Sequence, residues 1–175
     1  SDIRAADPGW QEICGFGASL SRPVLHGDRI YGLSSKEAPR FRVVAADIVD
    51  PSREWKTVLP ASPLVLTSLG AANDALYIQA LDGGISRLLR LPYDGVKAQA
   101  LTLPFQGTIR EFVAAPQDRG VLVRLASWTH PSTWLAYDPG SGHFLDLGWD
   151  PVPGADFSDC AGLEVHDGLE GHRDA

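Results

Sequence analysis

The chain has 175 residues, of which 44% are hydrophobic and 21% charged, with 18 glycines and 13 prolines spread along it. This composition is typical of a globular domain and excludes a disordered or low-complexity chain. No stretch approaches the ~18 consecutive apolar residues of a membrane span, and no signal-peptide pattern opens the chain. We therefore expect no membrane partner. Methionine is absent, which indicates either a trimmed protein or, as we favour, a piece of a longer polypeptide.

Negative charge is concentrated at the C-terminal end. Residues 150–175 hold seven acidic residues and one base, Arg173, and so carry six of the seven net negative charges. The preceding 149 residues are nearly neutral and lack the basic field that attracts nucleic acid or anionic lipid. We expect no nucleic-acid partner. The segment 150–175 is predicted to be a flexible acidic tail, or one that folds only against something absent from this chain.

Short apolar runs separated by turn residues predict strands along the whole chain, and no segment keeps helical spacing over three turns. The segment 10–14 is expected to be the outer strand of a preceding blade that occupies residues 1–14. Turn signals such as Gly27-Asp28, Asp82-Gly83-Gly84 and Pro139-Gly140 separate the later strands. Twelve strands are predicted there, at 20–26, 29–33, 41–47, 55–59, 64–69, 75–81, 86–91, 98–103, 109–115, 120–126, 134–137 and 144–147.

The strands repeat with a period of 44 residues. Asp50, Asp94 and Asp138 recur at this spacing, each in a predicted turn. A period of ~40–45 residues composed of short strands is the signature of β-propeller blades. The sequence thus predicts an all-β, partial propeller with blades at 15–60, 61–104 and 105–149. A closed seven-bladed ring at this period would need about 300 residues. We interpret the three aspartates as turn caps.

Three segments carry a resemblance to a known family. Residues 36–47 (KEAPRFRVVAAD) and 55–60 (WKTVLP) are similar to two strands of one blade in the prolyl oligopeptidase propeller. Residues 126–134 (ASWTHPSTW) are similar to a segment of the last blade in that family. The order and distances of these segments hold across residues 10–149. The chain therefore resembles the C-terminal three-plus blades of the prolyl oligopeptidase N-terminal propeller.

This resemblance implies a function that the chain does not carry alone. In the family, a seven-bladed propeller caps an α/β-hydrolase domain with a Ser-Asp-His triad, hinders folded proteins and admits short peptides, which are cut after proline. It implies that hydrolase domain as a partner and short peptides as substrates of the full enzyme. After Phe157 the family continues with S-x-D-G-x-x-(V/I)-P, whereas this chain has LEVHDGLEGH at 163–172. His166-Asp167-Gly168 is the remnant of that segment.

A direct search for reactive groups predicts no catalytic, cofactor-binding or metal-binding residue. The G-x-S-x-G nucleophile elbow is absent: residues 17–21 fail at the last glycine, and Gly140-Ser141-Gly142 is interpreted as a turn. Gly15-Phe16-Gly17 lacks the third glycine of a dinucleotide-binding loop. The histidines at 26, 130 and 143 are interpreted as structural or solvated. His166 and His172, among acidic residues, are not expected to bind a metal.

Two functional hypotheses remain. In the first, the chain is the gating part of a serine peptidase, with its tunnel lined by the innermost strands 20–26, 64–69 and 109–115. In the second, it is a stand-alone interaction module that self-associates to complete its ring. Cys14 and Cys160 lie near opposite ends; a disulfide between them is conceivable, but we favour two thiols of a cytoplasmic protein. A periplasmic location is the alternative.

Overall fold

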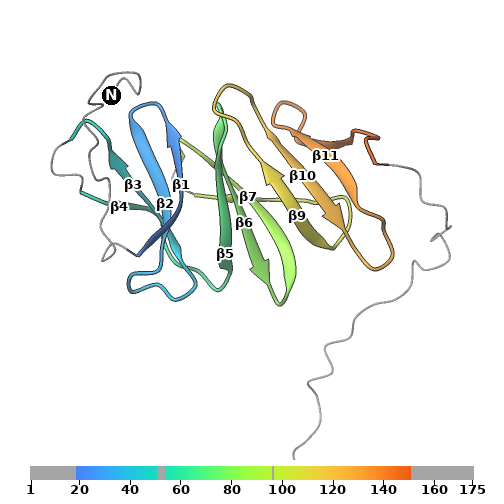
Figure 1. Cartoon of the computed structure of the whole chain (residues 1–175), viewed down its shortest axis with the longest axis horizontal. Coiled ribbons are helices and arrows are strands. Elements are labelled where there is room, and N and C mark those ends of the chain that lie inside the picture. The colour runs from blue at the N-terminus through green and yellow to red at the C-terminus, as the bar shows by residue number, and fades with distance from the viewer. Residues whose placement is uncertain (1–18, 51–53, 96, 151–175) are drawn as a thin grey trace, which may run out of the picture.

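The computed structural model describes residues 19–50, 54–95 and 97–150. Within these ranges the regular elements are all β-strands, and no helix is long and apolar enough to cross a membrane. The strands form three antiparallel sheets of four strands that stand side by side along the long axis (Figure 1). The predicted all-β, three-blade architecture is confirmed. The predicted strand at 10–14 and the tail beyond residue 150 lie outside the described residues.

Each sheet is a meander in which every strand pairs with its neighbours in the chain. The observed ends lie within two residues of the predicted ones. The strands of the first sheet are β1 (Leu20–His26), β2 (Arg29–Ser34), β3 (Arg42–Asp47) and β4 (Lys56–Leu59); those of the second are β5 (Val65–Ala71), β6 (Ala75–Asp82), β7 (Ile85–Pro92) and β8 (Gln99–Leu101); those of the third are β9 (Thr108–Val113), β10 (Val121–Ala126), β11 (Thr133–Asp138) and β12 (His143–Asp146).

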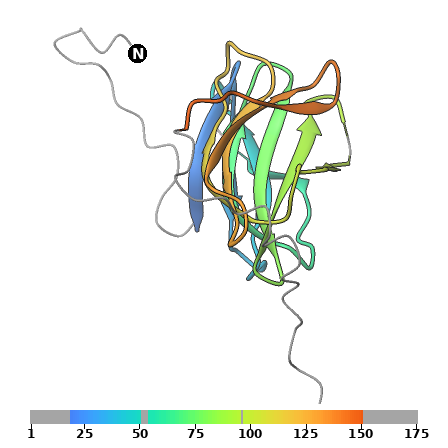
Figure 2. The same cartoon turned by 90° about the vertical axis from the view of Figure 1, so that its right-hand side faces the viewer.

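The middle sheet is apolar on both faces, so the first sheet packs on one face and the third sheet on the other. Successive side chains of a strand point to opposite faces. In β6, Leu76 and Ile78 therefore pack in one core with residues of the first sheet, while Tyr77 packs in another with residues of the third. Viewed along the long axis, the sheets lie one behind another (Figure 2). Burial of a single strand on both faces thus couples three sheets into one body.

Aspartates cap the turns that follow the third strand of the first sheet and of the third sheet. At the end of β11, Asp138 accepts hydrogen bonds from the backbone N–H groups of Gly140, at 2.9 Å, and Ser141, at 3.1 Å. These bonds confirm Asp138 as a turn cap and lower the pKa of its carboxyl group. At the end of β3 the equivalent cap is Asp47, which accepts from the N–H of Val49 at 3.0 Å. The role predicted for Asp50 from the 44-residue spacing stays a prediction.

The core between the first two sheets gives a first prediction. The side chain of Ile78 is fully buried there. We expect Ile78→Ala to lower the free energy of unfolding by about 2–5 kcal/mol, because it removes buried apolar contacts and leaves a cavity. Urea denaturation followed by tryptophan fluorescence measures this change.

The matched control is Val49→Ala, which shortens a side chain that is 72% exposed. We expect this variant to unfold within about 0.5 kcal/mol of the wild type. Equal destabilisation by both variants would contradict the placement of Ile78 between two packed sheets.

Candidate functional site on the first strands of the sheets

The first strand of each sheet, predicted to line a tunnel, lies at one edge of that sheet. β1 lies beside β5, and β5 approaches β9 so closely that a Cβ atom added at Gly70 would lie 2.9 Å from Cε1 of Phe112 in β9. β1, β5 and β9 are therefore neighbours across sheet boundaries. We call them the inner strands. The structure brings together the three strands that sequence reasoning selected.

Each inner strand carries a β-bulge near its start. In β1, Arg22 and Pro23 lie between the paired residues Ser21 and Val24, opposite the single residue Gly32. The pairing of β5 with β6 skips Thr67, and the pairing of β9 with β10 skips Arg110. A bulge inserts one extra residue, bends the strand and redirects the side chain there. Alternation of apolar and polar residues does not predict this, because an extra residue breaks the alternation itself.

The bulged residues differ in what they offer to solvent. Arg22 and Arg110 are exposed, and neither forms an ion pair with a carboxylate of the described residues. The backbone of Arg22 has φ of 52°, in the left-handed region. Thr67 is half-buried, and its hydroxyl group donates a hydrogen bond to the carbonyl oxygen of Gln79 at 3.2 Å. The inner strands therefore present two unpaired cations and one satisfied hydroxyl group.

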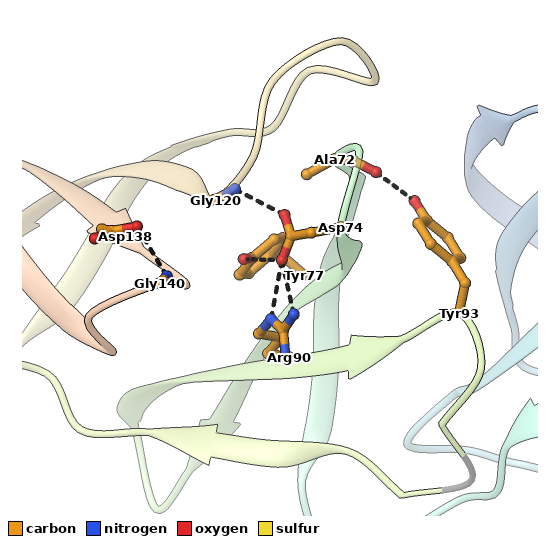
Figure 3. A network of polar contacts seen from close by, with 8 residues as sticks. All are labelled: Ala72, Asp74, Tyr77, Arg90, Tyr93, Gly120, Asp138 and Gly140. Atoms are coloured by element: carbon orange, nitrogen blue, oxygen red, sulfur yellow. Dashed lines mark hydrogen bonds and ion pairs between the residues drawn. The ribbon is translucent and has the colours of Figure 1, made fainter.

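Asp74 links the second and third sheets at the opposite end of the inner strands (Figure 3). One carboxylate oxygen accepts from the backbone N–H of Gly120 at 2.8 Å. The other accepts from the Arg90 guanidinium, at 2.9 and 3.0 Å, and from the Tyr77 hydroxyl at 3.0 Å. The side chain of Asp74 is only 7% exposed and that of Arg90 only 19%. A single carboxylate thus satisfies donors from both sheets.

The ionisation of Asp74 follows from these contacts. Burial disfavours the charged carboxylate, but the hydrogen bonds from Gly120, Arg90 and Tyr77 outweigh it and lower the pKa of Asp74. Burial and the same carboxylate raise the pKa of the Tyr77 phenol. Gly120 fits because its φ is +82° and an added Cβ atom would lie 2.1 Å from the carbonyl oxygen of Tyr137. We call this set the Asp74 cluster.

Further polar contacts join the second and third sheets away from the Asp74 cluster. The Gln79 amide donates to the carbonyl oxygen of Ile109 at 3.1 Å, and the Ser86 hydroxyl accepts from the N–H of Ile109 at 3.0 Å. Both hydrogen bonds are made to the backbone of Ile109, near the start of β9 and next to the bulge at Arg110. The position of this bulge is therefore fixed by one buried and one partly buried hydrogen bond from the middle sheet.

Two of the three histidines in the described ranges stack on aromatic rings, and the third, His143, is exposed. His26 stacks on Tyr93 with the ring centroids 3.7 Å apart, and His130 stacks on Phe105 at 4.3 Å. The Ser127 hydroxyl lies 3.2 Å from Nδ1 of His130 but accepts hydrogen bonds from the N–H groups of Thr129 and His130. Its geometry is that of a turn rather than of an activated nucleophile.

The remaining sequence candidates give no assembled site. Gly140 and Ser141 lie in the turn capped by Asp138. Within 19–50, 54–95 and 97–150, no three His, Cys, Asp or Glu side chains are grouped as metal ligands. Cys14, Cys160, His166 and His172 lie outside these ranges. The prediction that the chain holds no catalytic, cofactor or metal residue stays a prediction.

Four-stranded antiparallel meanders packed face to face, with their first strands side by side, define a partial β-propeller. The family model described as the prolyl oligopeptidase N-terminal β-propeller domain matches residues 15–145. The chain belongs to this family.

Individual relatives match the same part of the chain. A prolyl endopeptidase of Elizabethkingia meningoseptica is 25% identical over 134 residues, which are 75% of this chain and 19% of that protein. A structure from a study of two prolyl endopeptidases, on inter-domain dynamics in catalysis and specificity, is 30% identical over 79% of this chain and 20% of that one, with a TM-score of 0.69. Prolyl oligopeptidase B of Galerina marginata, without ligand, shares the fold with a TM-score of 0.71 at 19% identity, over 86% and 22% of the two chains. This chain thus spans about a fifth of their length.

The Asp74 cluster gives a second prediction. We expect Asp74→Asn to lower the free energy of unfolding at pH 7 by about 1–3 kcal/mol, because Arg90 loses its charged partner in a half-buried site. The folded-state pKa of Asp74 is lowered, so its stabilisation is complete above the unfolded value of about 4 and is lost as the pH falls through the folded value. Denaturation at pH values from 7 down to about 2 should show the variant and the wild type converging.

Asp82→Asn is the control, because Asp82 pairs with Arg87 at 3.2 Å in an exposed site, with their side chains 54% and 43% exposed. We expect a change in the free energy of unfolding below about 0.5 kcal/mol at pH 7. A difference for Asp74→Asn that stays constant down to the lowest pH would contradict an ionised carboxylate at the centre of the cluster.

Proposed function

We propose that this chain is the gating, substrate-size-limiting part of a prolyl oligopeptidase-like serine peptidase that cleaves short peptides after proline. On this proposal the chain is catalytically inert alone, and its partner is an α/β-hydrolase domain elsewhere in the parent polypeptide. The observation that carries the proposal is the family match across residues 15–145, which covers the three sheets almost entirely. The chain spans only about a fifth of its relatives, so an activity of the whole would need other segments.

The geometry favours one end of the sheets for contact with that domain. The chain leaves β12 at Asp146, at the end of the third sheet where β9 begins, because neighbouring strands are antiparallel. The loop between β10 and β11 lies at this same end and carries Trp128, whose side chain is 94% exposed. An exposed tryptophan beside the point where the chain continues is a typical anchor for a neighbouring domain. We propose that the hydrolase domain contacts this end.

The alternative is a stand-alone module that self-associates to complete its ring. The outer face of the third sheet favours it: Val113 is 49% exposed and Leu145 is 67% exposed. This face also carries Arg124, which forms ion pairs with Glu111 at 3.2 Å and Asp150 at 2.9 Å. It is thus more polar than the two faces buried between sheets, as expected of a contact that forms and dissociates.

A third prediction concerns activity. We expect the pure 175-residue chain to hydrolyse no fluorogenic peptide that contains proline, because the nucleophile elbow of the family is absent from its sequence. The gating part of the proposal is tested with the longer polypeptide encoded by the gene. That enzyme should cut short proline peptides but not a folded protein, and deletion of residues 19–150 should remove this size limit. Turnover by the chain alone, abolished by a serine-directed inhibitor, would contradict inertness.

A fourth prediction separates the two functions by solution mass. If the chain is the gating part of a larger enzyme, light scattering at several concentrations should give a monomer or open-ended aggregation, because no symmetric closure is built into it. A discrete closed oligomer with constant mass over a tenfold range of concentration would favour the stand-alone module. The variant Leu145→Glu, which charges the exposed face of the third sheet, should then dissociate it.

A further inference from the structure

The three bulges occupy equivalent places. Arg22, Thr67 and Arg110 are each the third residue of their inner strand, in β1, β5 and β9. The inner strands run in the same direction, because their C-terminal ends meet. Asp74, just after β5, binds Gly120, which follows β9. His26, at the end of β1, stacks on Tyr93, which binds the carbonyl oxygen of Ala72 after β5. The bulged residues therefore lie at one level, close to one end of the inner strands. In a propeller, the first strands surround the central channel, so this level is a mouth of that channel.

Two of these three residues are cations with free guanidinium groups. Arg22 and Arg110 are exposed, and no carboxylate of the described ranges forms an ion pair with either. Glu111, which follows Arg110, is already paired with Arg124 at 3.2 Å. The hydroxyl group of Thr67 donates its hydrogen bond to the carbonyl oxygen of Gln79. It is therefore not available as a donor to a bound anion. The mouth thus carries two guanidinium groups that form no ion pair with the described residues.

The opposite end of the inner strands carries the other sign. Loops at that end hold exposed acidic residues at positions 28, 50, 94 and 118, and the turn after β11 is capped by Asp138. These five acidic residues outnumber the exposed basic residues of the same loops, at positions 29, 97 and 119. The charge changes sign along the inner strands.

We propose that Arg22 and Arg110 form a carboxylate-binding band at this mouth, which holds the acidic side chains or the C-terminal carboxylate of a peptide in the channel. Guanidinium groups bind carboxylates through two parallel hydrogen bonds, which gives orientation as well as attraction. The bulges supply the geometry, because they turn these two side chains out of the regular alternation of the strands. This inference deepens the proposed function, on which its channel rests, by naming the class of peptide that the channel favours.

The test uses the 175-residue chain and a defined probe. The probe is a hexapeptide that carries three glutamates, compared with the same peptide carrying three glutamines. In an NMR titration at low salt, the acidic peptide should shift the backbone amide signals of Arg22, Thr67 and Arg110, and it should bind more tightly than the neutral one. Raising the ionic strength to about 1 M should weaken the acidic peptide selectively, because exposed charges are then screened within about 3 Å.

Variants assign this binding to the two arginines. We expect the double variant Arg22→Gln/Arg110→Gln to weaken the acidic peptide about 3- to 10-fold, since each exposed charge pair contributes a few tenths to one kcal/mol. The double variant Arg22→Lys/Arg110→Lys keeps the charges and should retain part of the affinity. The matched control is Arg119→Gln, which removes an exposed arginine at the opposite end and should leave the affinity unchanged.

The inference is overturned if both peptides bind equally, if neither binds, or if Arg119→Gln weakens binding as much as the double glutamine variant. Its failure is distinguishable from failure of the proposed function, because the readout is binding and needs no turnover. If the chain binds carboxylates but its gene encodes no hydrolase domain, the carboxylate-binding band is supported and the peptidase function is contradicted. If the longer polypeptide cleaves short proline peptides and the arginine variants do not change its activity on acidic substrates, the peptidase function is supported and the carboxylate-binding band is contradicted.

Discussion

The structure depends on one constraint: the middle sheet is apolar on both faces and must be covered twice. The strand β6 places Leu76 and Ile78 in the core with the first sheet and Tyr77 in the core with the third. A four-stranded sheet with two apolar faces has no stable existence alone in water. The alternation of side chains along β6 therefore requires a sheet on each face of the middle sheet. Packing of the first and third sheets on these faces brings the inner strands side by side.

Polar contacts then fix how the sheets sit against each other. The apolar cores are nondirectional, so they set which faces meet but not the alignment of the ends. The Asp74 cluster adds direction, since one nearly buried carboxylate accepts hydrogen bonds from its own sheet and from Gly120 beside the third. Gln79 and Ser86 act in the same way on the start of β9. The level of the bulge at Arg110 relative to that at Thr67 depends on these contacts.

The function that we propose uses the irregular start of the inner strands. The bulged residues interrupt the pairing with the second strand and leave Arg22 and Arg110 exposed. Strand irregularities of this kind cost regular hydrogen bonds but redirect side chains, and they are common beside functional sites. The cores between the sheets hold the irregular edge in place. Stability and the proposed recognition therefore use different residues of the same inner strands, as Ile109 in the core and the exposed Arg110 beside it show.

The sequence by itself determined the strands, their turns and the blade repeat, because these depend on local alternation and on residues such as Gly27 and Asp138. The predicted inner strands are also the observed ones. Two features escaped it for physical reasons. The bulges break the alternation that predicts side-chain direction, so Arg22 and Arg110 could not be selected within their strands. The Asp74 cluster joins residues 46 positions apart, and only packing of two sheets brings Asp74 to the backbone of Gly120.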